Sequence, residues 1–314
     1  MTDRRFSGVR AEPVYYTSLL KLSSEDITGR LAKGAEEAAR IAYAAAVGGS
    51  KVAQVVYGQM LLDGHGVTRD LQAAFRWFGI AAKADDTEGI NMLGRCHELG
   101  WGTAVDLEAA RTCYRRAAAK NHHWAQFNLA TLILREEGTP GAVTTALTLL
   151  VRSARQGNAK AMNMIGRYRE FGWIGPVNIP SAIRWYRRAA ERGCFRGAAH
   201  SGRFMLAQNR IDDAVSWYRR SAEWAPVDFC RDLAALLFNN QYTGLHTIAR
   251  MALRRAAEGD EAEDLFAYGQ ALAHGRGGPI NVNEAAIWLA RAQAKGFPGA
   301  LALLDDVRRK STAW

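Results

Sequence analysis

Apolar and small positions recur along this chain with a period of about 36 residues. One column of the pattern holds an aromatic residue or leucine, and the steps between successive members are 36, 36, 36, 32, 35 and 36 residues. The column consists of Phe78, Tyr114, Leu150, Tyr186, Tyr218, Leu253 and Leu289. Periods of this length are typical of supersecondary units that bury their apolar faces only by stacking on neighbouring copies.

Small residues fill three further columns at constant distances from the first. Alanine stands four residues before every member, and alanine or serine stands three residues after it. The third column lies sixteen residues after each member of the aromatic column, and so falls in the following repeat. Together with the first repeat's glycine, it consists of Gly58, Gly94, Ala130, Gly166, Gly202, Ala234 and Gly269. Spacings of three and four residues are typical of helices, so we predict two closely packed helices in each repeat. Helix A surrounds the glycine column and helix B surrounds the aromatic column.

The periodic part predicts the domain organisation. Seven repeats occupy residues 53–299, and residues 34–52 match a helix B alone, which we interpret as a half repeat. We expect residues 300–314 to form a C-terminal capping helix. Residues 1–33 precede the pattern and are expected to form an arm and a capping helix, because SSEDITGRLAKG at 23–34 has the serine and acidic residues of a helix start.

Charge and cysteine usage narrow the class of protein. The net charge of +10 favours an acidic partner, which could be nucleic acid, an anionic membrane or an acidic protein face. No apolar segment of a signal peptide follows Arg4 and Arg5, and the longest apolar stretch, Ile41–Val47, is too short to span a bilayer. The four cysteines form no CxxC pair. These features predict a cytoplasmic protein with reduced thiols and no membrane span.

The spaced columns resemble the Sel1-like repeat family, whose members are related to tetratricopeptide repeat proteins. The best match runs from YGQMLLDGHGV (57–67) through Asp70 and Ala74 to WFGIAAK (77–83), and WYRRAAERG (185–193) fits equally well. The resemblance covers about four-fifths of the chain. It implies an all-α fold, a right-handed α-solenoid of about seven antiparallel helix pairs of 32–36 residues, with helix A on the concave side.

The resemblance also implies a kind of function. Members of the family are usually adaptors, so we expect a monomeric, non-enzymatic protein that binds a partner protein or peptide in its concave groove. Bacterial relatives of this size can be encoded beside iron-uptake genes, which makes an iron-uptake-associated enzyme a candidate partner at the level of the family. Secreted relatives that handle β-lactams have paired cysteines, and this chain lacks them.

Helix A carries the sharper candidate site. Two sets of Asn, Arg and Glu at spacing i, i+4, i+7 occupy the same columns in the second and fourth repeats, and two arginines extend these columns into later repeats. The residues are Asn91, Arg95 and Glu98; Asn163, Arg167 and Glu170; Arg203; and Arg231. This spacing places each trio on one stripe, where arginine forks, carboxylates and amides could grip a peptide. The alternative is an ion-pair ladder between neighbouring helices.

Other features favour a structural role. In WYRRAAERG, the helical angle of 100° per residue places Arg187 and Arg188 on the outer, solvated face. A nucleic-acid-binding repeat protein is the alternative function, and it is disfavoured because the aromatic column points inward. Trp101 and Trp173 match each other in the loops and either wedge between repeats or contact a partner. With no HExxH, CxxC or GxxxxGK[ST] motif, we expect no catalytic residues, metal or cofactor.

Overall fold

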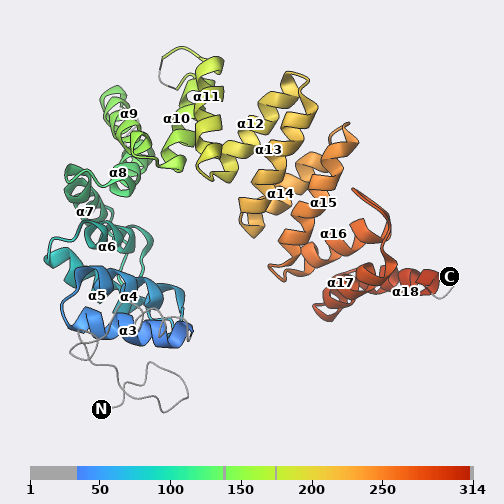
Figure 1. Ribbon diagram of the computed structural model, residues 1–314, viewed down its shortest axis with the longest axis horizontal. Coiled ribbons are helices and arrows are strands. Elements are labelled where there is room, and N and C mark those ends of the chain that lie inside the picture. Colours follow the sequence, from blue (N-terminus) through green and yellow to red (C-terminus); the bar gives the residue numbers. More distant parts are fainter. Residues whose placement is uncertain (1–33, 137–138, 174, 312–314) are drawn as a thin grey trace, which may run out of the picture. The chain divides into compact units, whose positions relative to one another are not determined.

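The computed structural model describes residues 34–136, 139–173 and 175–311. Within these ranges the chain forms sixteen helices and no strand (Figure 1). The helices belong to two compact units, Met1–Gln156 and Gly157–Trp314. The arm and capping helix expected over 1–33 lie outside the described residues, so that expectation stays a prediction.

The first unit contains a single helix followed by three helix pairs. The single helix is α3 (Ala35–Val47), which packs on α4 as a helix B packs on the next helix A. In each pair the two helices pack on each other. The pairs are α4 (Lys51–Asp63) with α5 (Leu71–Lys83), α6 (Thr87–Leu99) with α7 (Leu107–Ala119), and α8 (His123–Glu136) with α9 (Pro140–Arg155).

The second unit contains four helix pairs and a final single helix. The pairs are α10 (Ala159–Phe171) with α11 (Ile179–Glu191), α12 (Phe195–Ala207) with α13 (Ile211–Trp224), α14 (Val227–Phe238) with α15 (Thr243–Ala257), and α16 (Ala262–Ala273) with α17 (Val282–Ala294). The single helix α18 (Ala300–Ser311) packs on α17. Each unit is a stack of helix pairs, which confirms the all-α solenoid.

Aspartate side chains start several of the helices. Asp70, Asp86 and Asp106 each accept a hydrogen bond from the backbone N–H three residues further on, at 2.8, 2.7 and 2.9 Å. Such caps are worth about 1 kcal/mol each. At its C-terminal end, α6 is followed by Gly100, whose φ of 71° is a left-handed conformation that favours glycine.

The glycine column exists because helix A meets the aromatic ring of helix B there. A Cβ atom at Gly94 would lie 2.8 Å from the ring of Tyr114, and one at Gly166 would lie 2.7 Å from the ring of Tyr186. Both tyrosines are fully buried. Because interiors are close-packed, a larger side chain at these glycines would separate the two helices of the repeat.

Acidic residues tie consecutive repeats together at the turn from helix B to the next helix A. Asp85 has a left-handed φ of 64° and pairs with Arg116, at 2.7 Å, and with Lys120. Hydrogen bonds from Lys120 and Arg116 lower the pKa of Asp85 to about 2. Asp260, at the equivalent turn of the second unit, pairs with Arg291 at 2.9 Å. Basic residues of helix B therefore join repeats on that side of each unit.

Two further features of the described residues are the length of the helices and the state of the thiols. No helix in the described ranges is both long and apolar enough to cross a membrane. The thiols of Cys96, Cys113, Cys194 and Cys230 are all free, and only Cys113 is not buried. Burial raises the pKa of Cys96 to about 12, so its thiol stays protonated near neutral pH.

Candidate functional site

Glu98 links three helices of the first unit. It lies at the C-terminal end of α6 with 16% of its side chain exposed. One carboxylate oxygen accepts a hydrogen bond of 2.6 Å from the Tyr114 hydroxyl on α7, and the other accepts one of 3.2 Å from Arg135 on α8. Burial raises the pKa of Tyr114, and the hydrogen bond to Glu98 raises it further. Glu98 thus pairs with its own repeat and with the next one.

Glu170 makes the same two contacts in the second unit. It accepts a hydrogen bond of 2.7 Å from the Tyr186 hydroxyl on α11 and one of 2.5 Å from Arg203 on α12. Only 9% of its side chain is exposed. Burial again raises the pKa of Tyr186, as does the hydrogen bond to Glu170. The ion-pair ladder that the spacing left open as an alternative is therefore present in both units.

The asparagines of the two trios are also turned inward. Asn91 is 2% exposed, donates a hydrogen bond of 3.2 Å to Glu88, and accepts one of 3.0 Å from Asn128 on α8. Asn163 is 8% exposed, and its side-chain oxygen has no hydrogen-bond partner among the described residues. Neither asparagine lies where an approaching peptide would reach its whole amide.

Arg231 and Asp264 form the ion pair that joins the last two repeats. The guanidinium of Arg231 on α14 donates two hydrogen bonds, of 2.7 and 2.6 Å, to the carboxylate of Asp264 on α16. Asp264 is 1% exposed, whereas 40% of the Arg231 side chain is exposed. These hydrogen bonds raise the pKa of Arg231, and the pair fixes the spacing of α14 and α16.

Arg95 and Arg167 differ from the other members of the predicted site. The Arg95 guanidinium lies over the Trp101 ring, 4.7 Å from its centroid, and Arg167 lies over Trp173 at 5.3 Å. Neither arginine forms an ion pair with any residue in the described ranges. One N–H of Arg95 donates to the Met92 sulfur at 3.8 Å, and the other guanidinium donors of the two arginines form no hydrogen bond within the described ranges, so they stay available. These two arginines are the predicted site residues that repeat packing leaves with unused charge.

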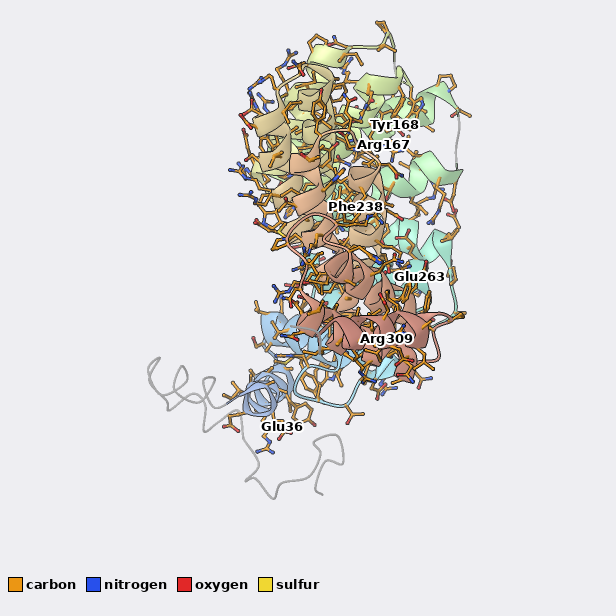
Figure 2. The ribbon with its side chains drawn as sticks, turned by 90° about the vertical axis from the view of Figure 1, so that its right-hand side faces the viewer. Glu36, Arg167, Tyr168, Phe238, Glu263 and Arg309 are labelled. Carbon is orange, nitrogen blue, oxygen red and sulfur yellow. The ribbon has the colours of Figure 1, made fainter. Side chains whose placement is uncertain are left out.

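The two loop tryptophans differ in their surroundings. Trp101 is partly buried and packs against the hydrophobic core of the first unit, as the wedge interpretation predicts. Trp173 is 52% exposed and stacks on Phe171, which is 51% exposed. Its ring also meets the ring of Tyr168, with 5.2 Å between the centroids. Tyr168 is the neighbour of Arg167 on α10 (Figure 2). In the fourth repeat the tryptophan therefore belongs to an aromatic cluster of Tyr168, Phe171 and Trp173 beside Arg167, in which Phe171 and Trp173 are exposed and Tyr168 is half-buried.

Arg187 and Arg188 lie on the outer face of α11, as the helical angles predict. Both are exposed. Arg187 pairs with Glu191 one turn further along at 3.6 Å, and Arg188 lies over Trp185 at 5.3 Å. In the second repeat the corresponding arginine, Arg116, reaches back to the preceding turn, as described above. The repeated arginine pairs thus take part in contacts within helix B and between repeats.

One functional candidate escaped the sequence pattern. Arg276 occupies the loop column that holds Trp101 and Trp173 in other repeats. Its guanidinium lies over the ring of Phe238 on α14, 4.3 Å from the centroid. Here the ring is on helix A and the arginine is in the loop, the reverse of Arg95 with Trp101. The aligned loop column was the signal that could have revealed it.

Because of His200, we expect the stability of the second unit to depend on pH. Its ring on α12 stacks on Tyr186 at 4.3 Å, and Arg203, Arg167, Arg196 and Glu170 are the charged groups that act on it. Burial lowers the pKa of His200 to about 4, with a further contribution from Arg203.

The unfolded chain binds a proton at this histidine near pH 6.5, so stability is full above that pH and falls as the pH drops towards 4. After discounting for partial exposure of the ring, we expect a loss of about 1–2 kcal/mol between pH 7 and pH 5. Urea unfolding at both pH values measures it. His200→Gln should remove this part of the loss, and an equal loss in the variant would contradict the assignment.

Comparison with known proteins agrees with this geometry. The Sel1 repeat profile matches six segments that together cover more than half of the chain: residues 51–86, 87–122, 125–158, 159–194, 199–223 and 262–297. The helices α14 and α15 fall between the matched segments, in the repeat that has ALRR in place of WYRR.

Two solved structures and one curated relative are similar to the chain. The c5321 protective antigen of uropathogenic Escherichia coli, which displays an SLR fold, is 28% identical with a TM-score of 0.52 over 87% of this chain and 60% of that one. A Sel1 repeat protein from Oxalobacter formigenes shares the fold, with 22% identity and a TM-score of 0.56 over 65% of this chain and 88% of its own.

Among curated proteins, the chain is 36% identical to Protein sel-1 homolog 2 of Mus musculus over 70 residues. That match covers 22% of this chain and spans 10% of the length of the mouse protein. The repeat profile, the helix pairs and the similar structures agree. The chain belongs to the Sel1 repeat family.

Proposed function

We propose that this protein is a non-enzymatic scaffold that binds a partner protein through the surface that the A helices form in each of its two units. Proteins built from Sel1 repeats are in general protein-interaction scaffolds. Helical repeat proteins commonly use the extended surface along their stacked units for binding. The finer proposal concerns which residues of this chain take part.

The arginine–tryptophan pairs carry the proposal. Arg95 with Trp101 and Arg167 with Trp173 occupy equivalent positions 72 residues apart, and the cations have no acidic partner among the described residues. Arginine and tryptophan are the residues most enriched at the energetic centres of protein interfaces. A stacked guanidinium is oriented in advance and loses little side-chain entropy on binding a carboxylate or a peptide carbonyl.

The remaining members of the predicted site are assigned a supporting role. Glu98 pairs with Arg135, and Glu170 pairs with Arg203. Arg231 pairs with Asp264, so each of these pairs holds neighbouring helices at a fixed spacing. Their contribution to binding is to keep the A-helix surface rigid. The outer helices use their basic residues between repeats, as Arg116 does at Asp85.

The proposal includes partner and compartment. A partner with an acidic surface suits the net charge of +10. An iron-uptake-associated enzyme is the candidate partner that the family resemblance suggests. Four free thiols suit the cytoplasm, which we propose as the compartment. We propose a monomer that binds its partner through the described repeats.

Affinity purification of the tagged full chain from its native cell tests the proposal. We expect a discrete protein to be recovered, in the same amount after nuclease treatment. Nucleic-acid binding predicts instead a loss of recovery with nuclease, and an affinity that falls steeply with salt because counterions are released. Recovery of nucleic acid alone would overturn the proposal in favour of that alternative.

A further inference from the structure

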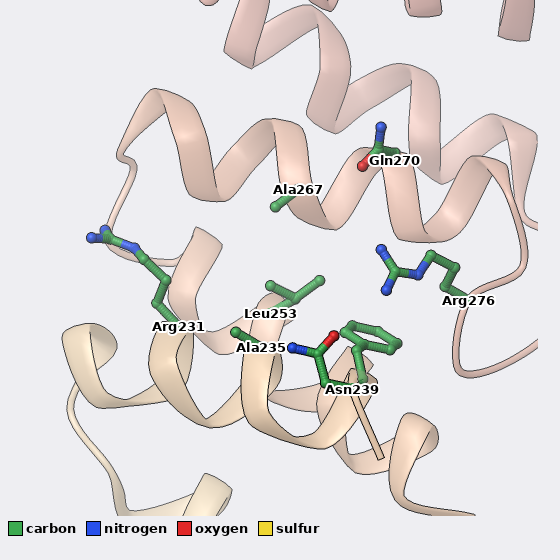
Figure 3. Close-up of a pocket in the computed structure, with 8 residues that line it drawn as sticks. Arg231, Ala235, Asn239, Leu253, Ala267, Gln270 and Arg276 are labelled. Carbon is green, nitrogen blue, oxygen red and sulfur yellow. The ribbon is translucent and has the colours of Figure 1, made fainter. Parts of the chain in front are cut away.

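A pocket of about 300 Å³ opens between the A helices of the last two repeats in the second unit. Arg231 and Arg276 stand at its opposite ends, and Asn239 and Gln270 lie on facing walls contributed by α14 and α16 (Figure 3). Its remaining surface is formed by the Phe238 ring and aliphatic side chains. Among the residues that the structure describes, no acidic one lines it.

Arg276 supplies the unbalanced charge of this pocket. It is exposed and forms no ion pair with any residue of 34–136, 139–173 or 175–311. Its guanidinium lies over the Phe238 ring, 4.3 Å from the centroid, and its N–H donors form no hydrogen bond with a described residue, so they stay free for a planar bidentate acceptor such as a carboxylate. Its backbone N–H donates a hydrogen bond of 2.9 Å to the carbonyl of Ala271, which holds the loop on the end of α16.

Arg231 supplies hydrogen-bond donors to the pocket but no unbalanced charge. Two of the five N–H donors of its guanidinium bind Asp264, which balances its charge. Since 40% of its side chain is exposed, its remaining donors stay accessible at the other end of the pocket. The pocket therefore has one strong carboxylate site at Arg276 and a weaker hydrogen-bonding site at Arg231.

The two amides match a peptide backbone. The side chains of Asn239 and Gln270 form no hydrogen bond within the described part of the chain, and each amide offers both donors and an acceptor. A volume of about 300 Å³ is at the lower limit for a ligand pocket, which suits one side chain and its flanking backbone. A nucleic-acid base is disfavoured because Arg276 already covers the face of Phe238.

Resting on the proposed function, we infer that this pocket binds an extended peptide segment of the partner through an aspartate or glutamate side chain. The carboxylate lies on the edge of Arg276, and the peptide backbone lies between Asn239 and Gln270. Arg276 is thus the residue that gives this end of the A-helix surface its preference for an acidic segment.

A displayed library of random decapeptides, selected on the full-length chain, tests the inference. We expect the selected peptides to share one acidic position. For a labelled peptide of that set, fluorescence anisotropy should show affinity about ten- to hundred-fold weaker for Arg276→Gln, the loss typical of a charge-assisted hydrogen bond. Arg219→Gln on α13 makes the same charge change on an outer helix and should change affinity less than two-fold. Replacing the peptide's acidic residue by its amide should not add to the effect of Arg276→Gln.

The outcomes separate this inference from the proposed function. Peptides without an acidic position, or peptides insensitive to Arg276→Gln, overturn the pocket assignment. If such peptides instead lose affinity when Arg95 and Arg167 are changed to glutamate, the proposed function stands and only the assignment of the pocket is wrong. If no peptide depends on any of these residues, both fall. A labelled ten-nucleotide single strand that binds more tightly, and through Arg276, also overturns the inference.

Discussion

The double variant Arg95→Glu with Arg167→Glu is expected to lose partner binding by about a hundred-fold or more. Each substitution removes a guanidinium poised over a tryptophan and places a carboxylate where an acidic partner surface approaches. Loss of one desolvated charge pair at an interface costs about 2–5 kcal/mol, and charge reversal adds repulsion. Titration of the purified partner by calorimetry or anisotropy measures the change.

The matched control is Arg187→Glu with Arg188→Glu. It changes the net charge by the same four units, but on the exposed outer face of α11. We expect its affinity to stay within about three-fold of the wild type, an effect of long-range charge only. Helicity and melting temperature should be nearly unchanged in both double variants. An equal loss in the control would show that net charge, and not the A-helix surface, drives binding.

Gly277→Ala is expected to be the most destabilising single change in the loops of the second unit. The φ of Gly277 is +75°, and a Cβ there would collide with the backbone carbonyl oxygen of His246 at the start of α15. Left-handed strain costs about 1–2 kcal/mol for alanine. The collision also forces the loop away from α15, so we expect a total loss of about 3–4 kcal/mol.

Gly296 provides a control with the same backbone conformation. Its φ is +76°, and a Cβ there meets no atom within 4 Å. Gly296→Ala should therefore lose only the strain, about 1–2 kcal/mol. Urea unfolding of the two variants compares the free energies of unfolding. Equal losses would mean that the loop can move away from His246 freely, and the contact would then not define how consecutive repeats stack.

The repeat period could be predicted because packing imposes it on individual residues. A small residue at Gly94 or Gly166 and a ring at Tyr114 or Tyr186 are two halves of one contact, so they recur together at constant spacing. A periodic pattern of this kind predicts which helices pair. It also placed Arg187 and Arg188 on the outer face, because helical angles depend only on sequence position.

The roles of the polar residues could not be predicted to the same extent. Glu98 and Glu170 stand on the same stripe as Arg95 and Arg167, and spacing alone cannot tell a carboxylate used in packing from one offered to a partner. The deciding partner of Glu98 is the hydroxyl of Tyr114, sixteen residues away on another helix. A sequence reading that pairs each helix A glutamate with the tyrosine of its own repeat would have found this contact.

The loop column marks Arg276 itself, but its contact with Phe238 could not be predicted because Phe238 lies in a different repeat. Its stacking on Phe238 depends on how α14 and α16 are spaced, which the pair of Arg231 and Asp264 helps to set. Within-repeat periodicity contains no information on such a contact. The pocket is therefore a property of two repeats together.

Photo-cross-linking in the native cell tests most directly whether the A helices form the binding surface. Leu99 and Phe171 occupy equivalent positions at the ends of α6 and α10 and are 48% and 51% exposed. Ile80 and Ile287 lie on the B helices α5 and α17 with similar exposure, 44% and 62%. Benzoylphenylalanine is introduced at one of the four positions at a time. We predict a discrete cross-linked protein from positions 99 and 171 and none from positions 80 and 287. Cross-links confined to positions 80 and 287 would contradict the account.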